Sequence, residues 1–215
     1  WDIGLSFDGD GDRILVVDHD GTVIDGDALI YVLAVYLKGQ GRLNKNKVVL
    51  TKMSNLGIIK AFERQGISVE IVNVGDKYVL EKLNEQKLSI GGENSGHVIL
   101  REFINTGDGL LVGAYLLKVL QETKQTLSEL TSDIQMWPQE LVNLRTFNKE
   151  IIKDDRVVSL VNSIREELGD NGKMFVRASG TEPLLRVTVS CEKQEDLNRY
   201  RDQVVGLLNR IKEEV

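Results

Sequence analysis

The sequence has 215 residues, with 27 basic and 33 acidic side chains, so that its formal net charge is −6. This length fits one large domain or two small ones, and the 41% of hydrophobic residues suffices for a sizeable core. The acidic balance argues against nucleic acid as a partner, and no apolar run approaches the ~20 residues that a membrane span needs, so that we expect no membrane association.

The first 24 residues read as a strand followed by a hairpin. The opening WDIGLSF has no methionine and is already strand-like, which leads us to expect a piece of a longer protein. The stretch ILVVDHDGTVID (14–25) places two β-rich runs around a polar turn. An isolated hairpin is marginal in water, so we expect this segment to be mobile or to pack against another molecule.

Between residues 25 and 133, strands alternate with helices. This rhythm predicts an α/β domain with a mostly parallel sheet. Ser54 is the expected N-cap of one helix and Gly66 its end. The expected helices are 26–41, 54–66, 75–86 and 107–124, and the expected strands are 47–52, 67–74 and both arms of 88–100.

The pattern changes after MWPQ (136–139). The order strand, helix, strand, strand, helix then predicts a small α+β domain with helices on one face of an antiparallel sheet. The one cysteine, Cys191, ends an apolar strand and is expected to be structural, which fits a reducing compartment. We see no signal peptide and expect a cytoplasmic protein. The expected strands are 140–147, 173–178 and 184–191, and the expected helices are 154–169 and 193–214.

FDGDGDR (7–13) gathers three carboxylates, those of Asp8, Asp10 and Asp12. Gly9 and Gly11 allow the backbone to fold so that the three side chains converge. Carboxylate oxygens suit a hard cation such as Mg²⁺. An EF-hand loop is excluded, because its required glycine and glutamate positions hold Arg13 and His19. Arg13 is suited to contact a phosphate.

A rival interpretation concerns Asp18 and Asp20. An apolar strand followed by DHDGT resembles the first motif of haloacid-dehalogenase-type phosphatases, with Asp18 as nucleophile, Asp20 as acid/base and Thr51 in a second motif. Such enzymes need a later acidic pair for Mg²⁺. Asp154 and Asp155 instead begin an amphipathic helix, where first-turn charge has a simpler cause.

Two further loops are rich in glycine and polar side chains. GGENSGH (91–97) offers Glu93, Ser95 and His97 as partners for sugar hydroxyls, although a polar loop without ligand is also possible. RASGTEP (177–183) offers hydroxyls and backbone amides as an anion nest, with Arg177 and Arg186 supplying positive charge. An ordinary β-hairpin turn is the alternative there.

In this order and spacing, the three loops resemble those of the α-D-phosphohexomutases. TKMSNLG (51–57) and NTGDGLL (105–111) resemble the branch that acts on glucosamine phosphates. The resemblance covers essentially the whole chain and implies the end of a second domain (1–24), a mixed α/β third domain (25–135) and a small α+β, TATA-binding-protein-like fourth domain (140–215).

The resemblance also implies roles for particular residues. Asp8, Asp10 and Asp12 would hold Mg²⁺, and Arg13 would sit beside a phosphoserine as a catalytic residue. The phosphoserine loop belongs to the family's first domain and is absent here, so we expect these residues alone to be inactive. Glu93, Ser95, His97 and Lys77 would bind the sugar, and Arg177, Ser179, Gly180, Thr181 and Arg186 would bind its phosphate.

The expected substrate is a hexosamine phosphate, which a phosphoserine and a bisphosphate intermediate would interconvert between its 6- and 1-phosphates. A mannose or glucose phosphate remains an alternative within the family, because Lys77 and Asn94 stand where arginine and glutamine are usual. A sugar-phosphate-binding module without catalysis is the alternative outside it. A homodimer is possible.

Overall fold

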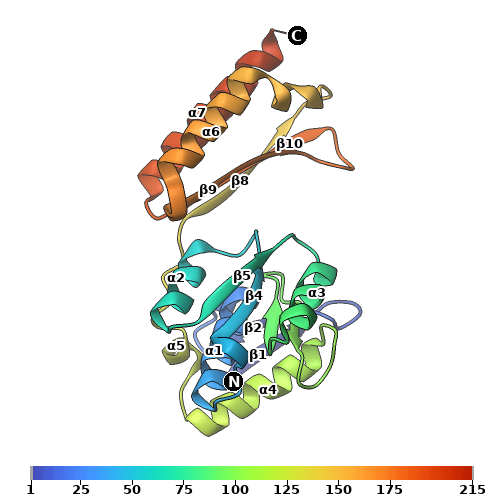
Figure 1. Ribbon diagram of the computed structural model, residues 1–215, viewed down its shortest axis with the longest axis vertical. Helices are drawn as coiled ribbons and strands as arrows, with labels where there is room; N and C mark the ends of the chain where they lie inside the picture. The colour runs from blue at the N-terminus through green and yellow to red at the C-terminus, as the bar shows by residue number, and fades with distance from the viewer. Residues whose placement is uncertain (1, 215) are drawn as a thin grey trace. The chain divides into compact units, whose positions relative to one another are not determined.

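The computed structural model describes residues 2–214, and the chain forms two compact units divided between Gln135 and Met136 (Figure 1). The division falls where the MWPQ stretch interrupts the pattern of the sequence. Within the described residues, no helix combines the length and the apolar character that a membrane span requires.

The first three strands form an antiparallel sheet in the order β1-β2-β3. The predicted hairpin is confirmed, and the Asp18 amide donates to the Thr22 carbonyl at 2.9 Å across its turn. Ile14, Val16 and Ile24 are buried in one core with residues of the following helices. The segment therefore packs within its own unit, in contrast to the expectation that it would be mobile or would pack against another molecule. The strands are β1 (Ile3–Phe7), β2 (Ile14–Asp18) and β3 (Val23–Ile24).

A second sheet of the same unit has the order β5-β4-β6-β7. Strand β4 pairs in parallel with both β5 and β6, whereas β7 runs antiparallel to β6, so the mostly parallel sheet is confirmed. Because β4 and β6 are parallel, their carboxyl ends lie at the same edge of the sheet, where residues 93–97 follow β6. The strands are β4 (Lys47–Thr51), β5 (Ser68–Val72), β6 (Ile90–Gly92) and β7 (Val98–Leu100).

Helices cover both faces of this sheet (Figure 1). Because successive side chains of a strand point to opposite faces, Val48 packs with the cluster of α1, α2 and α4, and Val49 packs with that of α3. The helices are α1 (Gly26–Gly39), α2 (Leu56–Arg64), α3 (Asp76–Gln86), α4 (Gly109–Thr123) and α5 (Leu127–Leu130), and a 3₁₀ turn, η1 (Asn44–Asn46), precedes β4.

The N-cap of α2 is Asn55 and not Ser54 as predicted. The Asn55 side-chain oxygen accepts a hydrogen bond from the Gly57 backbone amide at 2.8 Å. The backbone amide of Asn55 donates to the Asp27 carboxylate at 2.9 Å. Ser54 is buried in the preceding turn, where its amide bonds to Thr51. A tertiary bond to α1 therefore fixes the start of α2, and Ser54 is one residue too early.

The second unit is an antiparallel sheet in the order β8-β10-β9, with α6 and α7 packed on one face, as predicted (Figure 1). Cys191 is buried in this core, and burial raises the pKa of its thiol, which agrees with a structural role. The elements are β8 (Gln139–Arg145), η2 (Lys149–Lys153), α6 (Asp155–Leu168), η3 (Gly169–Asn171), β9 (Gly172–Ala178), β10 (Leu184–Cys191) and α7 (Gln194–Glu213).

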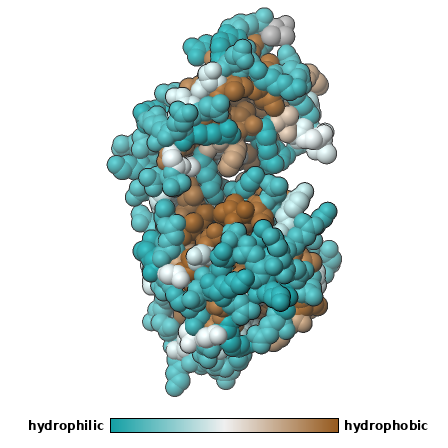
Figure 2. All heavy atoms as spheres, viewed as in Figure 1, coloured by the Kyte–Doolittle hydropathy of each residue, from teal (hydrophilic) through white to brown (hydrophobic). Residues whose placement is uncertain are grey.

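Hydrophilic side chains cover most of the visible face of each unit (Figure 2). The apolar residues lie mainly in the hydrophobic clusters of the two units, as the amphipathic patterns predict.

The buried carboxylate of Asp18 yields a test of the first unit. Its side chain is 3% exposed and accepts hydrogen bonds from the Ser128 hydroxyl and from His19. Burial alone would raise the pKa of Asp18, but these donors hold it below its ordinary value. We expect Ser128→Ala to lower the free energy of unfolding by about 1–3 kcal/mol, because it removes a donor from a buried acceptor.

Urea unfolding at neutral pH checks this expectation. Ser132→Ala is the matched control, because its exposed hydroxyl donates to the nearby Glu129 carbonyl, at 2.8 Å, and not to a buried carboxylate. Since the native pKa of Asp18 is depressed, its contribution is complete above the ordinary value of 3.8 and declines as the pH falls below it. Equal midpoints for the two variants at neutral pH would contradict the role given to Ser128.

Candidate functional site

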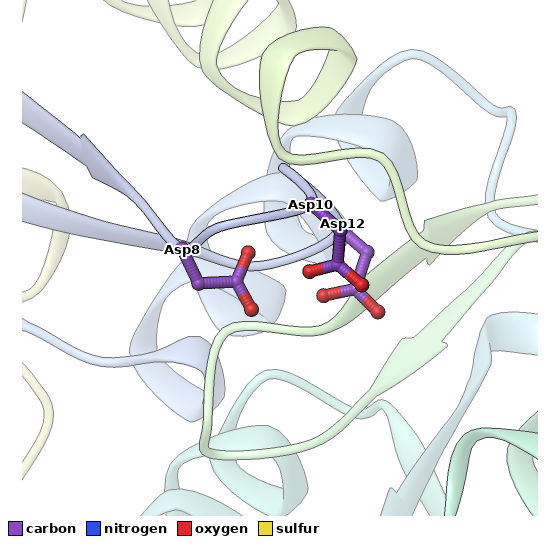
Figure 3. A group of neighbouring side chains, drawn as sticks. All are labelled: Asp8, Asp10 and Asp12. Carbon is purple, nitrogen blue, oxygen red and sulfur yellow. The ribbon is translucent and has the colours of Figure 1, made fainter.

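The loop between β1 and β2 brings three carboxylates together, as predicted. One oxygen from each of Asp8, Asp10 and Asp12 lies within 4.8 Å of the others, and the side chains extend to the same side of the loop (Figure 3). Gly11, at φ +73°, allows the backbone to turn between them. We refer to residues 8–13 as the carboxylate loop.

Arg13 lies beside the carboxylates. Its Nε is 3.8 Å from Asp8 and 3.7 Å from Asp12, and its amide donates to Asp8 at 3.2 Å. Partial burial would raise the pKa of Asp8, but the Arg13 amide, the Asp12 side chain and the Arg13 charge hold it below its ordinary value. The Asp8 carboxylate therefore stays ionised at neutral pH, as a cation ligand requires.

The residues fit a hard divalent cation. Carboxylate oxygens are the ligands that Mg²⁺ prefers. Asp12 Oδ1 is shielded from solvent and, among the described residues, accepts no hydrogen bond. A buried acceptor without a donor is costly, and a cation held between the three carboxylates would satisfy it.

The loop at 93–97, here called the sugar loop, is bonded to the first residue of β2, which directly follows the carboxylate loop. The Ile14 amide donates to the Gly96 carbonyl at 3.1 Å. Gly96 has φ +96°, and a Cβ there would lie 2.1 Å from the Ile14 carbonyl oxygen, so only glycine permits this approach. Backbone contact at one glycine thus fixes the position of the two loops relative to each other.

The start of α4 holds the carboxylate loop from another side. The Gly109 amide donates to the Gly11 carbonyl at 2.9 Å, and Asp108 caps α4 by accepting the Leu111 amide at 2.9 Å. The NTGDGLL stretch therefore caps α4 and holds the carboxylate loop, a role that the sequence alone did not predict.

His97 is placed differently from the prediction. Its ring is 4% exposed, and its Nδ1 lies 3.1 Å from Asp12 Oδ2. A Cβ at Gly107 would come within 2.4 Å of the ring, so the glycine provides the space that it occupies. This geometry favours a histidine that orients the Asp12 carboxylate over the direct sugar contact that the sequence predicts.

Glu93 and Ser95 differ in their surroundings. Ser95 is exposed, as a ligand contact requires. Glu93 is half-buried, and its Oε1 accepts the Gly75 amide at 2.9 Å just before α3. This bond links the sugar loop to the helix whose first turn carries Lys77, with a side chain that is 75% exposed.

In the second unit, the predicted phosphate residues lie at the β9–β10 turn. Arg177 and Arg186 are directly opposite each other across the two strands. Like charges in such a pair are unfavourable, and Glu182 offsets them only in part, at 3.1 Å from Arg186. Gly180 and Thr181 are exposed at the tip of the turn, whereas Ser179 is buried. The arrangement fits an anion site.

The rival phosphatase interpretation does not fit this geometry. Asp18, its nucleophile, is buried and bonded to Ser128 and His19. Asp20 accepts the Thr22 amide at 2.9 Å within the hairpin turn. A buried carboxylate in a structural turn cannot approach a phosphorus atom.

Two family models match the chain, one to each unit. Residues 25–136 match the phosphoglucomutase/phosphomannomutase alpha/beta/alpha domain III, and residues 141–207 match the C-terminal domain of the same family. The chain belongs to the phosphoglucomutase/phosphomannomutase family. This membership excludes the phosphatase alternative and agrees with the fold class predicted from the sequence.

Curated relatives of the family include phosphoglucosamine mutases of Lacticaseibacillus casei, 44% identical, and Streptococcus mutans, 43% identical. Each alignment covers 96% of this chain and 46% of the relative, so the chain spans about half the length of the curated relatives it matches.

Solved structures share the fold. Aspergillus fumigatus N-acetylphosphoglucosamine mutase, in complex with GlcNAc-6P and magnesium, has a TM-score of 0.76 at 19% identity, covering 97% of this chain and 52% of that one. An N-acetylglucosamine-phosphate mutase in a substrate complex has a TM-score of 0.75 at 21% identity, covering 96% and 48%.

The contact between Gly107 and His97 yields a test of the metal site. We expect Gly107→Ala to displace the His97 ring and to weaken binding of Mn²⁺, a paramagnetic substitute for Mg²⁺, by about tenfold, as disturbed supports of metal ligands do. Electron paramagnetic resonance titration measures the affinity. Gly39→Ala is the control, because a Cβ at Gly39 meets open space. Unchanged Mn²⁺ affinity in Gly107→Ala would show that the His97 ring does not orient Asp12.

Proposed function

We propose that this chain carries three of the four active-site loops of a phosphoglucosamine mutase, which interconverts glucosamine 6-phosphate and glucosamine 1-phosphate. The phosphoserine would come from a segment outside these 215 residues. The bond between the carboxylate loop and the sugar loop carries the proposal, because it joins a cation site to a set of sugar-binding groups within one unit. The names of the curated relatives support glucosamine as the sugar.

Asp8, Asp10 and Asp12 would hold Mg²⁺, which, when bound, offsets negative charge on a transferring phosphoryl group. His97 keeps the Asp12 carboxylate in place. The Arg13 side chain is 52% exposed, so its guanidinium can contact a phosphoryl group that approaches the carboxylate loop.

The sugar and its second phosphate would bind through other groups. Ser95 is exposed to ligand, and Glu93 is held by Gly75 so that one carboxylate oxygen has a fixed direction toward sugar hydroxyls. Lys77, with a side chain that is 75% exposed, would add positive charge. In the second unit, Arg177 and Arg186 would grip the phosphate that is not being transferred, and the amides of the turn would complete its binding.

The metal assignment predicts weak binding of Mg²⁺ by this chain, at about 1 mM or weaker, because three carboxylates alone leave positions of the cation to water. Isothermal titration calorimetry measures the affinity. The variant with asparagine at positions 8, 10 and 12 should lose binding, whereas Asp20→Asn, which changes an exposed acid of the hairpin turn, should not. Binding that survives in the triple variant would defeat the assignment.

The activity itself is tested by supplying the absent half. Incubated alone with glucosamine 6-phosphate, Mg²⁺ and a sugar bisphosphate, the chain should show no turnover above background. Addition of the phosphorylated N-terminal half of a phosphoglucosamine mutase, as a separate polypeptide, should restore formation of glucosamine 1-phosphate, measured by ³¹P NMR.

Mannose and glucose phosphates tested in the same mixture decide the sugar. If mannose phosphate or glucose phosphate were converted faster than glucosamine phosphate, the activity would be that of a phosphomannomutase or phosphoglucomutase. Binding of all three sugar phosphates without conversion in the reconstituted mixture would favour a non-catalytic binding module. A homodimer and a cytoplasmic location stay predictions.

A further inference from the structure

Lys149 contacts the turn between β9 and β10 (residues 179–183), here called the phosphate loop, although it belongs to none of the three loops singled out in the sequence. It begins η2 and is half-buried. Its ammonium group donates to the Ser179 carbonyl oxygen at 2.5 Å. The two residues are 30 positions apart, so the RASGTEP motif and its neighbours in the sequence do not predict the contact.

The local structure holds Lys149 in this place. The Thr146 amide donates to the Pro183 carbonyl at 3.0 Å, which joins the end of β8 to the far side of the phosphate loop. The Asn148 amide donates to the Thr146 hydroxyl at 3.1 Å, and its side chain accepts the Glu150 amide at 3.1 Å. Segment 146–149 is thus bonded to the loop at both of its ends, and Lys149 supplies one of the two bonds.

The bond to Ser179 fixes the direction of the next amide. The Ser179 carbonyl and the Gly180 N–H belong to one peptide group, and in a trans peptide these two bonds point in opposite directions. No cis peptide bond occurs among the described residues. Because the carbonyl is directed at Lys149, the Gly180 N–H is directed away from it. A Cβ at Gly180 would meet nothing within 4 Å, so this part of the loop is open to a ligand.

Other bonds of the loop show which amides a ligand can use. The Ser179 amide donates to the Leu184 carbonyl at 2.9 Å, and the Glu182 amide donates to the Ser179 hydroxyl at 3.2 Å. The Leu184 amide donates to the Glu182 carbonyl at 2.9 Å. The amides of Gly180 and Thr181 are then the ones that an anion at this loop would meet.

We infer that Lys149 is a positioning residue of the phosphate loop, and that its bond to the Ser179 carbonyl aims the Gly180 amide at the substrate's phosphate. The inference rests on the proposed function, which supplies the phosphate. Lys149 acts through the peptide group, which it holds in one orientation before the ligand arrives. Such preorganisation raises affinity because the loop loses less freedom on binding.

The experiment uses the ¹⁵N-labelled 215-residue chain with inorganic phosphate as the probe. The variants are Lys149→Met, which keeps the length of the stem without the donor, and Lys149→Arg, which keeps a charged donor. Lys153→Met is the matched control, because it removes an exposed ammonium from the same 3₁₀ helix, where it pairs with Glu150. Amide shifts give the affinity, and hydrogen exchange without phosphate reports on the free loop.

In Lys149→Met, we expect phosphate to bind about three- to tenfold more weakly. Before any phosphate is added, we expect the Ser179 amide, which is bonded to the Leu184 carbonyl, to exchange about tenfold faster because the loop opens more often. Lys149→Arg and Lys153→Met should stay within about twofold of the parent chain in both measurements.

Each other outcome has a definite meaning. Weaker phosphate binding with unchanged exchange of the Ser179 amide would overturn the inference, since Lys149 would then act by its charge alone. Unchanged phosphate affinity in Lys149→Met would overturn it as well. If phosphate does not shift the Gly180 and Thr181 amides of the parent chain, the phosphate site of the proposed function fails, whereas the exchange measurement still tests the bond from Lys149.

Discussion

The approach of the Gly96 carbonyl to the Ile14 amide determines how the site in the first unit is arranged. The carboxylate loop lies on the β1–β2 hairpin and the sugar loop on the β6–β7 hairpin, and these hairpins belong to different sheets. Gly96 admits the bond between them because it has no side chain. The distance from Asp12 to His97, and with it the orientation of the Asp12 carboxylate, follows from this contact.

Charge organises the second unit in a different way. Arg177 and Arg186 face each other across β9 and β10, and one carboxylate, that of Glu182, pairs with the second of them. The strands are held in register by their ladder and by the buried face against α6 and α7. The hydrophobic core therefore holds Arg177 and Arg186 close together despite the repulsion between their charges. A bound anion would reduce this repulsion, and such charge placement before binding is common in binding sites.

Much of the fold and part of the site were predictable from the sequence, because the signals concerned are local. Helical periodicity, the DHDG turn and the run of three aspartates each depend on residues within a few positions of one another. The remainder depends on contacts between distant segments. Asn55 replaces Ser54 as N-cap because of Asp27, the burial of His97 depends on Asp12 and Gly107, and Lys149 meets Ser179 across a 30-residue separation. No periodicity contains such information.

The bond between Asp12 and His97 also bears on the order of folding. These residues are 85 positions apart, so that the whole alternation of β4, α2, β5, α3 and β6 lies between them. Closing a chain segment of that length costs entropy that local contacts do not recover, and it therefore occurs after the intervening elements have formed. During synthesis, the three carboxylates leave the ribosome long before the histidine does. The contact between Asp12 and His97 is thus expected to form late in the folding of this unit.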